Sequence, residues 1–372
     1  WAERFGMDNC LFLTGGSTLG LHAALALFCR PGDQVLIDRG CHRAVYNALA
    51  LLDLEPVYLP RPWRAGEGIA GPISPTDVEN LLDSHPNIKT ICIASPTYSG
   101  VLSDIKELSH IIHARGGNLI VDGAHGAHLP FLGVDAFSGC DALICSAHKT
   151  LPALGQSALL FTNGVDPRRV RQMTSVFGSS SPSYPMMISL DCARDYLDGK
   201  GMEEYRRVAR RTAALRAAFP SLQEGELRLD PTRLTLTSPD GNALAQALEG
   251  ENIWPEMADS GHVVLILTAQ DSEDDLHRLE EALQRHRTLL GTPPILPPPP
   301  MPKPVRSLRE ALFAPVERLP LENCLGRVAA GQLAPYPPGV PVVAPGEVIG
   351  EKELAYLREI GYNNSDVPVM CP

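Results

Sequence analysis

The sequence predicts an α/β protein with a mostly parallel, seven-stranded sheet, followed by a small α+β unit and a C-terminal α+β tail. Three observations support this fold class. Short apolar runs alternate with helical patterns from residue 11 to about residue 161, which is typical of a parallel sheet covered on both faces. Shorter strands and helices follow from residue 227. A proline-dense stretch at 292–304 then reads as an extended linker before the tail.

Each strand expected in the first half of the chain ends beside a polar or turn-forming cluster. The strands are expected at 10–14, 34–38, 56–59, 89–94, 118–122, 142–145 and 157–161. The helices between them are expected at about 19–29, 42–52, 76–83 and 104–114, with a Gly- and Pro-rich loop up to residue 72. Ligands of parallel sheets bind beyond the carboxyl ends of the strands. We therefore expect the polar clusters to form a site there.

The second half of the chain divides into three further parts. Helical patterns are expected at 166–174, 185–198, 202–219, 242–249, 272–290, 307–312 and 350–361, with strands at 233–237 and 262–267. The resulting domain prediction is a large domain at 1–200, a small α+β domain at 201–291, the linker at 292–304 and a C-terminal domain at 305–372.

Composition narrows the class of function. Of the 372 residues, 44% are hydrophobic and 20% are charged, and the formal net charge is −11. An acidic balance argues against a nucleic-acid partner and mildly suits a cationic small molecule. No apolar run approaches the roughly 20 residues of a membrane span, and no signal peptide opens the sequence. The nine scattered cysteines lack a C-x-x-C pair, so we expect reduced thiols in a cytoplasmic protein.

One short stretch, residues 142–156, provides the centre of the functional prediction. An apolar strand ends at Ser146 and is followed at once by His148 and Lys149, with small residues and Thr150 around them. A lysine at such a strand end is a candidate Schiff-base nucleophile, because its amine can be held near a carbonyl and kept partly unprotonated. The alternative is a solvated loop lysine.

A second cluster, residues 15–18, reads Gly-Gly-Ser-Thr between a strand and a helix. Here Gly16 lets the backbone approach a phosphate, Ser17 and Thr18 supply hydroxyls, and the helix N-terminus supplies N–H groups. Taken alone, the cluster favours an ordinary Ser or Thr helix cap. Ser146 and His148 would reach the same phosphate from the other side.

A third cluster follows the strand that ends at Asp122. An ionised carboxylate there can hold a protonated ring nitrogen and so make an aromatic cofactor a better electron sink. His125 would then bond a phenolate oxygen or a substrate carboxylate. The alternatives are a turn cap and a metal pair formed by His125 and His128 at spacing i, i+3. No further ligand pair is evident, so we rank the metal second and predict none.

Two aromatic side chains complete the prediction. His42 opens a helix after a strand and would stack on a flat ring, and Tyr98 lies in the turn after another strand. Their alternatives are a helix-start residue and core packing. A phosphate cradle, a stacking histidine, a ring-nitrogen aspartate and a strand-end lysine thus follow one another in the chain. Together these parts match the requirements of pyridoxal 5'-phosphate (PLP).

The chain resembles the ornithine/lysine/arginine decarboxylase family, PLP enzymes of the aspartate-aminotransferase fold (fold type I), from about Phe5 to the C-terminus. The motifs that carry the resemblance are Thr14–Thr18, Asp38–His42, Ser95–Val101, Val121–His128, Ser146–Leu151, Ser179–Tyr184, the run Tyr-Pro-Pro-Gly-Val-Pro from 336 and Pro345-Gly-Glu347. Two departures are Gly123, where members commonly carry an acidic residue, and an N-terminal Thr-Pro-Gly-His-type segment that this sequence does not contain.

The resemblance implies a role for each site residue. Lys149 becomes the Schiff-base lysine, Asp122 the partner of the pyridine nitrogen and His42 the residue on the ring face. The catalytic residues are then Lys149, His148, Asp122 and His125. The cofactor-binding residues are Gly16, Ser17, Thr18, His42, Asp122, Ala124, His125, Ser146, His148 and Lys149. A homodimer or a higher homo-oligomer is also implied, because such sites are built at subunit interfaces.

The reaction that we expect is α-decarboxylation of arginine, lysine or ornithine. Tyr98 and Glu347 are the candidate substrate residues, with Glu347 as the acid near the entrance that selects a cationic side chain. The alternative for Glu347 is an exposed turn glutamate. The rival functions are another fold type I reaction (transamination or carbon–sulfur cleavage) and a truncated, non-catalytic relative. A carboxylate-binding arginine would favour transamination, and Arg233 is the candidate.

Overall fold

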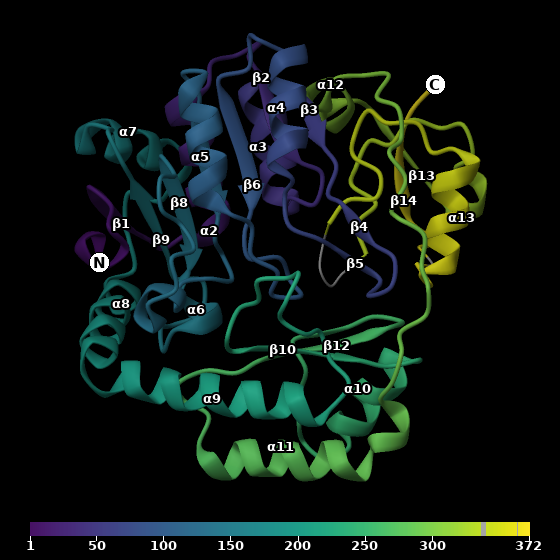
Figure 1. The fold of residues 1–372 in the computed structure, drawn as a ribbon. Coiled ribbons are helices and arrows are strands. Elements are labelled where there is room, and N and C mark those ends of the chain that lie inside the picture. Colours follow the sequence, from purple (N-terminus) through teal and green to yellow (C-terminus); the bar gives the residue numbers. More distant parts are fainter. Residues whose placement is uncertain (336–339, 363) are drawn as a thin grey trace.

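A seven-stranded sheet forms the centre of the large domain (Figure 1). The computed structural model describes residues 1–335, 340–362 and 364–372. In spatial order the strands are β1 (Asn9–Leu13), β9 (Ala158–Thr162), β8 (Ala142–Ser146), β7 (Asn118–Asp122), β6 (Thr90–Ala94), β2 (Gln34–Asp38) and β3 (Glu55–Leu59). The five strands from β8 to β3 are parallel, whereas β9 and β1 are antiparallel to their neighbours. The predicted fold class is therefore confirmed.

Helices cover both faces of this sheet because alternate residues of each strand face opposite sides. In β2, Leu36 belongs to one core cluster and Val35 and Ile37 to the other. The first face is covered by α4 (Pro75–Ser84), α5 (Ile105–Ala114), η1 (Leu129–Leu132) and α8 (Tyr184–Tyr196). The second is covered by α2 (Gly16–Phe28), α3 (Arg43–Leu52), α7 (Pro167–Phe177) and α12 (Leu308–Phe313). A short α1 (Ala2–Phe5) stacks Phe5 on Phe161 of β9 at 4.1 Å between ring centroids.

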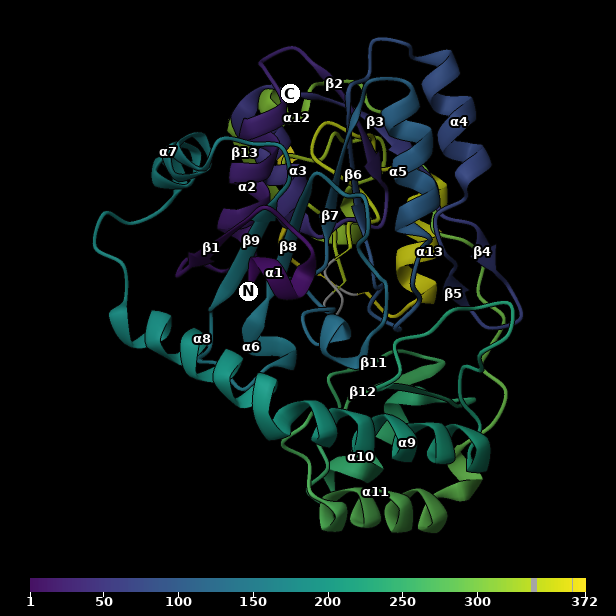
Figure 2. The same ribbon diagram turned by 60° about the vertical axis from the view of Figure 1, so that its left-hand side comes forward.

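A second, antiparallel sheet has the order β10 (Arg233–Thr237), β12 (His262–Ile266) and β11 (Met257–Ala258). Its helices are α9 (Met202–Ala218), α10 (Gly241–Glu249) and α11 (Glu273–Arg285), with η3 (Arg287–Leu289) after them. The expected helix at 272–290 thus ends early, and its start is fixed by a capping box between Ser272 and Asp275. Figure 2 shows α8 leading through η2 (Leu197–Gly201) into α9, which passes below the large domain to this unit.

The C-terminal unit pairs β13 (Val316–Leu319) with β14 (Val367–Met370) and adds η4 (Leu321–Asn323) and α13 (Glu351–Glu359). The loop expected up to residue 72 contains a hairpin of β4 (Trp63–Arg64) and β5 (Ile69–Ala70), which the sequence reading missed. This hairpin holds the linker, because Trp63 Nε1 donates to the Leu296 carbonyl at 2.9 Å. Among the described helices, none is long and apolar enough to cross a membrane.

Candidate active site

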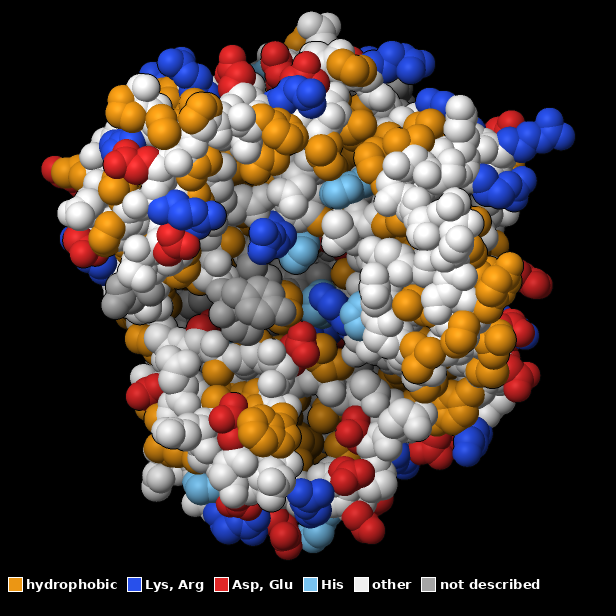
Figure 3. All heavy atoms as spheres, turned by 180° about the vertical axis from the view of Figure 1, so that it is seen from behind, with side chains coloured by type: hydrophobic (Ala, Val, Ile, Leu, Met, Phe, Trp, Pro, Cys, Tyr) orange, Lys and Arg blue, Asp and Glu red, His pale blue; other side chains and the backbone are white. Residues whose placement is uncertain are grey.

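The site lies where the carboxyl ends of β2, β6, β7 and β8 meet, at the edge of the large sheet that faces the small one (Figure 1). Lys149 is placed there by α6 (Ala147–Thr150), a single helical turn that follows β8 directly. Its Nζ lies 2.9 Å from His125 Nε2, and His125 follows β7 in the neighbouring strand-end loop. Figure 3 shows a hollow on this face in which His side chains gather around a Lys or Arg side chain, with an acidic side chain at its rim.

The environment of Lys149 favours the uncharged amine. Burial lowers the pKa of Lys149, and the charge of Arg233 lowers it further, although Asp122 and Glu256 act in the opposite direction. Asp122 is itself only 6% exposed, and its Oδ1 accepts the Ala124 N–H at 3.1 Å. Burial raises the pKa of Asp122, whereas the charge of Lys149 acts against that rise. Each of the two groups therefore favours the charged form of the other.

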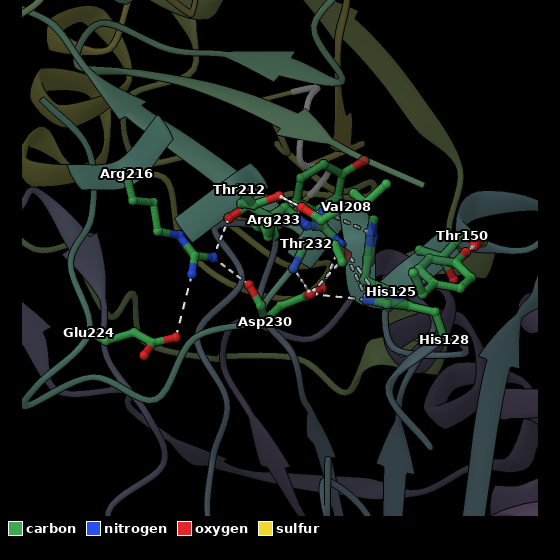
Figure 4. Close-up of polar contacts among 12 residues, drawn as sticks. His125, His128, Thr150, Val208, Thr212, Arg216, Glu224, Asp230, Thr232 and Arg233 are labelled. Atoms are coloured by element: carbon green, nitrogen blue, oxygen red, sulfur yellow. Dashed lines mark hydrogen bonds and ion pairs between the residues drawn. The ribbon is translucent and has the colours of Figure 1, made fainter. Parts of the chain in front are cut away.

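The hydrogen bonds of His125 fix its tautomer (Figure 4). Arg233 Nη1 lies 3.5 Å from His125 Nδ1, and Arg233 Nη2 donates to the His125 carbonyl. Because a guanidinium has donors and no acceptor, Nδ1 must accept. Burial, with the charge of Lys149, holds the pKa of His125 well below its usual range, so the ring is neutral. Nε2 is then the ring nitrogen that faces the Lys149 amine.

His128, three residues further on, points into a separate buried network (Figure 4). Its Nε2 lies 3.0 Å from Asp230 Oδ1 and 2.9 Å from Thr232 Oγ1, and its ring stacks on Tyr205. The two histidines of the considered metal pair thus serve different partners. Among the described residues, no group of three or more His, Cys, Asp or Glu side chains is arranged to hold a metal ion.

Asp230 organises that network and links it to the site. It bonds the Thr232 N–H and lies 3.7 Å from Arg233 Nη2, while its carbonyl accepts from Arg216. Burial alone would raise the pKa of Asp230, but the charges of His128 and Arg233 lower it below its usual range. Sequence reasoning missed Asp230 because its histidine partner, His128, lies 102 positions away in the chain. The one local signal is Asp230-Pro-Thr-Arg233, a turn just before β10.

The predicted phosphate cradle lies at the start of α2. The helix begins at Gly16, and its N-cap is Gly15, so Ser17 and Thr18 lie inside the first turn. The interpretation of this cluster as a Ser or Thr cap is therefore wrong. Gly16 has φ +71°, a conformation that favours glycine because a side chain would be strained there. The amides of this first turn are left for a ligand, since Gly15 makes no side-chain cap bond.

Ser146 meets the cradle from β8. Its Oγ lies 2.7 Å from Ser17 Oγ, although the two residues are 129 positions apart in the chain. His148 is turned beside it, with Nδ1 2.9 Å from the Ser157 carbonyl. Because a carbonyl can only accept, Nδ1 donates, and Nε2 is the nitrogen left to accept or exchange a proton. The structure thus brings together Ser17 and Ser146, two of the three hydroxyls that the sequence assigns to one phosphate.

His42 and Tyr98 stand beside the lysine on different elements. His42 is the N-cap of α3, where Nδ1 accepts the Ala44 N–H at 3.2 Å. Burial and then the charge of Lys149 lower the pKa of His42 to about 4, so the ring is neutral at pH 7. The Tyr98 ring centroid lies 4.4 Å from that of His125 and 5.7 Å from Lys149 Nζ. Tyr98 is thus part of the site rather than of the core.

Gly123 is required by local packing. A Cβ at this position would lie 2.6 Å from Leu143 Cδ1 and 3.1 Å from Phe137 Cε1. An acidic side chain would therefore force Leu143 or Phe137 to move. Leu143 and Phe137 are therefore the neighbours that a side chain at this position would displace.

Glu347 is fully buried, so its interpretation as an exposed turn residue is wrong. Its two carboxylate oxygens accept from Arg39 Nη1 and Nη2 at 2.7 and 2.8 Å, and Oε2 also accepts the Ala344 N–H. Arg39 in turn donates to the Val342 carbonyl. Its role as the acid at the entrance stays a prediction, and in this structure Arg39 already neutralises it. The Tyr-Pro-Pro-Gly run at 336–339 lies outside the described residues.

These residues fit PLP. The cofactor needs a lysine amine, a carboxylate for its ring nitrogen, a flat partner for its ring and donors for its phosphate. Here Lys149, Asp122 and His42 would provide the first three. The N–H groups at the start of α2, with Ser17 and Ser146, provide the donors.

Comparisons with known proteins cover nearly the whole chain. Residues 1–237 match the model of the Orn/Lys/Arg decarboxylase major domain, and residues 296–369 match that of the Orn/Lys/Arg decarboxylase C-terminal domain. The arginine decarboxylase of Bacillus subtilis is 30% identical and that of Halalkalibacterium halodurans 28% identical, each over 100% of this chain and 81% of the relative.

Solved structures show the same fold. The constitutive lysine decarboxylase of Escherichia coli superimposes with a TM-score of 0.81 at 18% identity, over 100% of this chain and 71% of that chain. The ureidoglycine-glyoxylate aminotransferase of Bacillus subtilis gives a TM-score of 0.61 at 16% identity, over 78% and 84%. The family models and the fold agree with the site. The chain therefore belongs to the Orn/Lys/Arg decarboxylase family and is a PLP-dependent amino-acid decarboxylase of fold type I.

Proposed function

We propose that this protein removes the α-carboxyl group of a basic L-amino acid, with arginine as the first substrate to test. The observation that carries the proposal is the contact of Lys149 with a neutral His125, beside a buried Asp122. The choice of arginine is supported by the relatives named arginine decarboxylase, which are 27–30% identical, whereas those named lysine decarboxylase are 21–23% identical.

The residues of the chain divide the work of the reaction. When bound, PLP supplies an electron sink for the pair left by the departing carboxylate. Asp122 would hold negative charge at the ring nitrogen, and the α2 N-terminus with Ser17 and Ser146 would anchor the phosphate. His42 would cover one face of the ring and help to exclude water. Lys149 or His148 would return a proton to the product, since an amine and an imidazole can both act as general acids.

The position of Arg233 favours decarboxylation over transamination. An arginine that grips a substrate carboxylate must present its N–H groups to the hollow. Arg233 is only 2% exposed, and its terminal nitrogens donate to the carbonyls of Tyr98 and His125. Its guanidinium therefore bonds the backbone that lines the site and does not present its N–H groups to a substrate carboxylate.

We also propose that the protein works in the cytoplasm as a homodimer. The nine cysteines are all free thiols. Large apolar side chains of the large domain lie exposed, among them Leu154, Tyr184 and Ile188. These are the kind of residues that a second subunit would cover.

The proposed function is tested by product analysis of the PLP-loaded protein. Carbon dioxide and amine release is measured with arginine, lysine and ornithine side by side, and we expect agmatine from arginine as the main product. Borohydride reduction followed by peptide mapping should label Lys149. A keto-acid product, or a label at another lysine, would contradict the proposal.

A further inference from the structure

The turn that precedes β10 is fixed against the large domain. The Asp230 N–H donates to the Gly100 carbonyl at 2.8 Å, and Gly100 lies in the loop that follows β6. Gly100 has φ +86°, and a Cβ there would lie 2.7 Å from Arg233 Cγ. A side chain at position 100 would therefore displace the stem of Arg233. The close approach of these two segments sets where Asp230 and Arg233 lie relative to the strand ends.

The two carboxylate oxygens of Asp230 face different partners. Oδ1 accepts the Thr232 N–H at 2.9 Å and the Thr232 hydroxyl at 3.1 Å, and it lies 3.0 Å from His128 Nε2. These contacts fix the orientation of the carboxylate. Oδ2 makes no hydrogen bond with the described residues and lies 3.7 Å from Arg233 Nη2. Because both side chains are buried, water screens this pair little, and Asp230 is the buried counter-ion of Arg233.

Arg233 in turn holds His125 beside Lys149. Its Nη2 donates to the His125 carbonyl at 3.3 Å, and its Nη1 lies 3.5 Å from His125 Nδ1, so the guanidinium contacts both the backbone and the ring. On the other side of the ring, His125 Nε2 lies 2.9 Å from Lys149 Nζ. The position of Arg233 therefore affects the position of the amine through a single intervening side chain.

A second set of contacts leads from Asp230 to the same helical turn. The His128 ring stacks on that of Tyr205, with 5.4 Å between the ring centroids, and the Tyr205 hydroxyl donates to the Thr150 carbonyl. Thr150 directly follows Lys149 in α6. The contacts of Asp230 thus reach both the side chain of Lys149 and its neighbour in the backbone.

The charges around Lys149 show what the buried pair contributes. Charged and titratable side chains from several elements surround the amine: Asp122 and His125 after β7, His42 at the start of α3, Tyr98 after β6, Arg233 in β10 and Glu256 before β11. Burial is the main cause of the lowered pKa of Lys149, and the charge of Arg233 lowers it further. Burial also lowers the pKa of Arg233, whereas the charge of Asp230 favours its charged form. If Arg233 were no longer held in place, the pKa of Lys149 would rise toward its usual value.

We propose that Asp230 is a positioning residue of the decarboxylation site, which holds Arg233 and His125 in place against Lys149. The inference rests on the proposed function, because it takes Lys149 as the reacting amine. It makes the small domain a determinant of the reactivity of this lysine, although the predicted cofactor-binding residues all lie between positions 16 and 149.

The test measures the amine directly, in the full chain without cofactor. Competitive acylation with acetic anhydride over a range of pH, followed by mass spectrometry, gives the pKa of Lys149, with the exposed Lys106 as internal reference. In Asp230→Asn we expect the pKa of Lys149 to rise by about 1, which slows its acylation at neutral pH about 10-fold. Arg233→Met should give the same rise, and the double variant should add nothing to either single variant, because the two residues act as one pair. Asp230→Glu keeps the carboxylate and should restore part of the change.

The matched control is Asp259→Asn, since Asp259 forms an aspartate–histidine pair with His262 in the same domain, at 3.0 Å. It should leave the pKa of Lys149 unchanged. The proposal is wrong if that pKa stays the same or falls in a folded Asp230→Asn or Arg233→Met variant, or if it rises equally in the control. Circular dichroism and thermal unfolding establish which variants are folded. If Asp230→Asn does not fold, Arg233→Met decides by the same criterion, and loss of the fold in both would make the pair a requirement of folding and overturn the proposal.

Failure of the proposed function would appear separately. It would be seen as borohydride labelling of another lysine, or as a keto-acid product, in the unchanged protein. The acylation measurement needs neither cofactor nor substrate, so its outcome does not depend on the reaction that the protein catalyses.

Discussion

Two buried polar regions lie at the same edge of the large sheet, and they are built in opposite ways. In the Arg39–Glu347 pair the guanidinium meets both carboxylate oxygens, and the remaining bonds run to backbone groups. At Lys149 the amine faces a neutral histidine, and its nearest acid, Asp122, is buried. In the first arrangement the two charges neutralise each other, and the pair holds the C-terminal unit against the large domain. The second leaves charge and proton-binding capacity available for chemistry.

The largest effect on activity is expected when Lys149, at the centre of the second region, is replaced. Lys149→Ala should lower decarboxylation at least about 10⁴-fold, the scale seen when a covalent catalytic group is removed, and should abolish borohydride labelling. Its stability should change little, because the lysine is only partly buried. Activity and thermal unfolding are measured together, with Lys89→Ala at the opposite end of β6 as the control. Retained activity in Lys149→Ala would remove the lysine from the mechanism.

Breaking the Arg39–Glu347 pair should mainly affect stability. Glu347→Gln leaves Arg39 as a buried charge without its partner, which typically costs about 3–5 kcal/mol. Urea unfolding of the cofactor-free protein measures this loss. Glu317→Gln is the control, because its ion pair with Arg327 is exposed and should be worth under about 1 kcal/mol. Equal losses of unfolding free energy in the two variants would show that the buried pair stabilises the fold no more than the exposed pair does.

Asp122→Asn sharpens the comparison, since it removes a buried carboxylate that has no arginine. The amide oxygen can still accept the Ala124 N–H, so we expect the fold to be kept. Activity should fall about 10²–10³-fold, the scale of losing one preorganised electrostatic group. The pKa of Lys149 should fall further, because Asp122 favours its charged form. The pH dependence of borohydride trapping reports this change, and a rise of the lysine pKa would contradict the assignment.

The smallest effect is expected from His42. Its pKa of about 4 in the folded protein lies below its ordinary value of 6.5, so the unfolded chain binds more protons between these values. Stability must therefore fall as the pH is lowered from about 6.5 to about 4. His42→Asn keeps a good helix cap and should flatten this fall by about 1–3 kcal/mol. Urea unfolding without cofactor at pH 4, 5, 6 and 7 measures the slope, and parallel slopes would exclude His42 as the source.

The sequence predicted the elements whose signals are local. The strand ends at Asp38, Asp122 and Ser146 follow from apolar runs that stop at a polar residue, and the structure places all three at one edge. The sequence predicts the start of this helix at residue 19, three residues after the observed start of α2 at Gly16. The reason is that Gly16 and Ser17 are typical of a loop.

Pairings between distant residues could not be predicted in this way. Glu347 and Arg39 are 308 positions apart, and Arg233 and His125 are 108 apart. A carboxylate after Pro-Gly looks like an exposed turn until a guanidinium from another domain covers it. Glu256 carries no motif at all, and only the meeting of the small domain with Tyr98 gives it a place in the site.

The Arg39–Glu347 pair has a consequence for the linker at 292–304. The C-terminal unit is clasped to the large domain by this pair and by Arg309, which donates to the carbonyls of Ala50 and Leu51 at the end of α3. A protease cut within the linker should therefore yield two fragments that elute together from a sizing column until a denaturant separates them. On this expectation, the folded protein does not need an intact peptide chain within the linker to stay assembled.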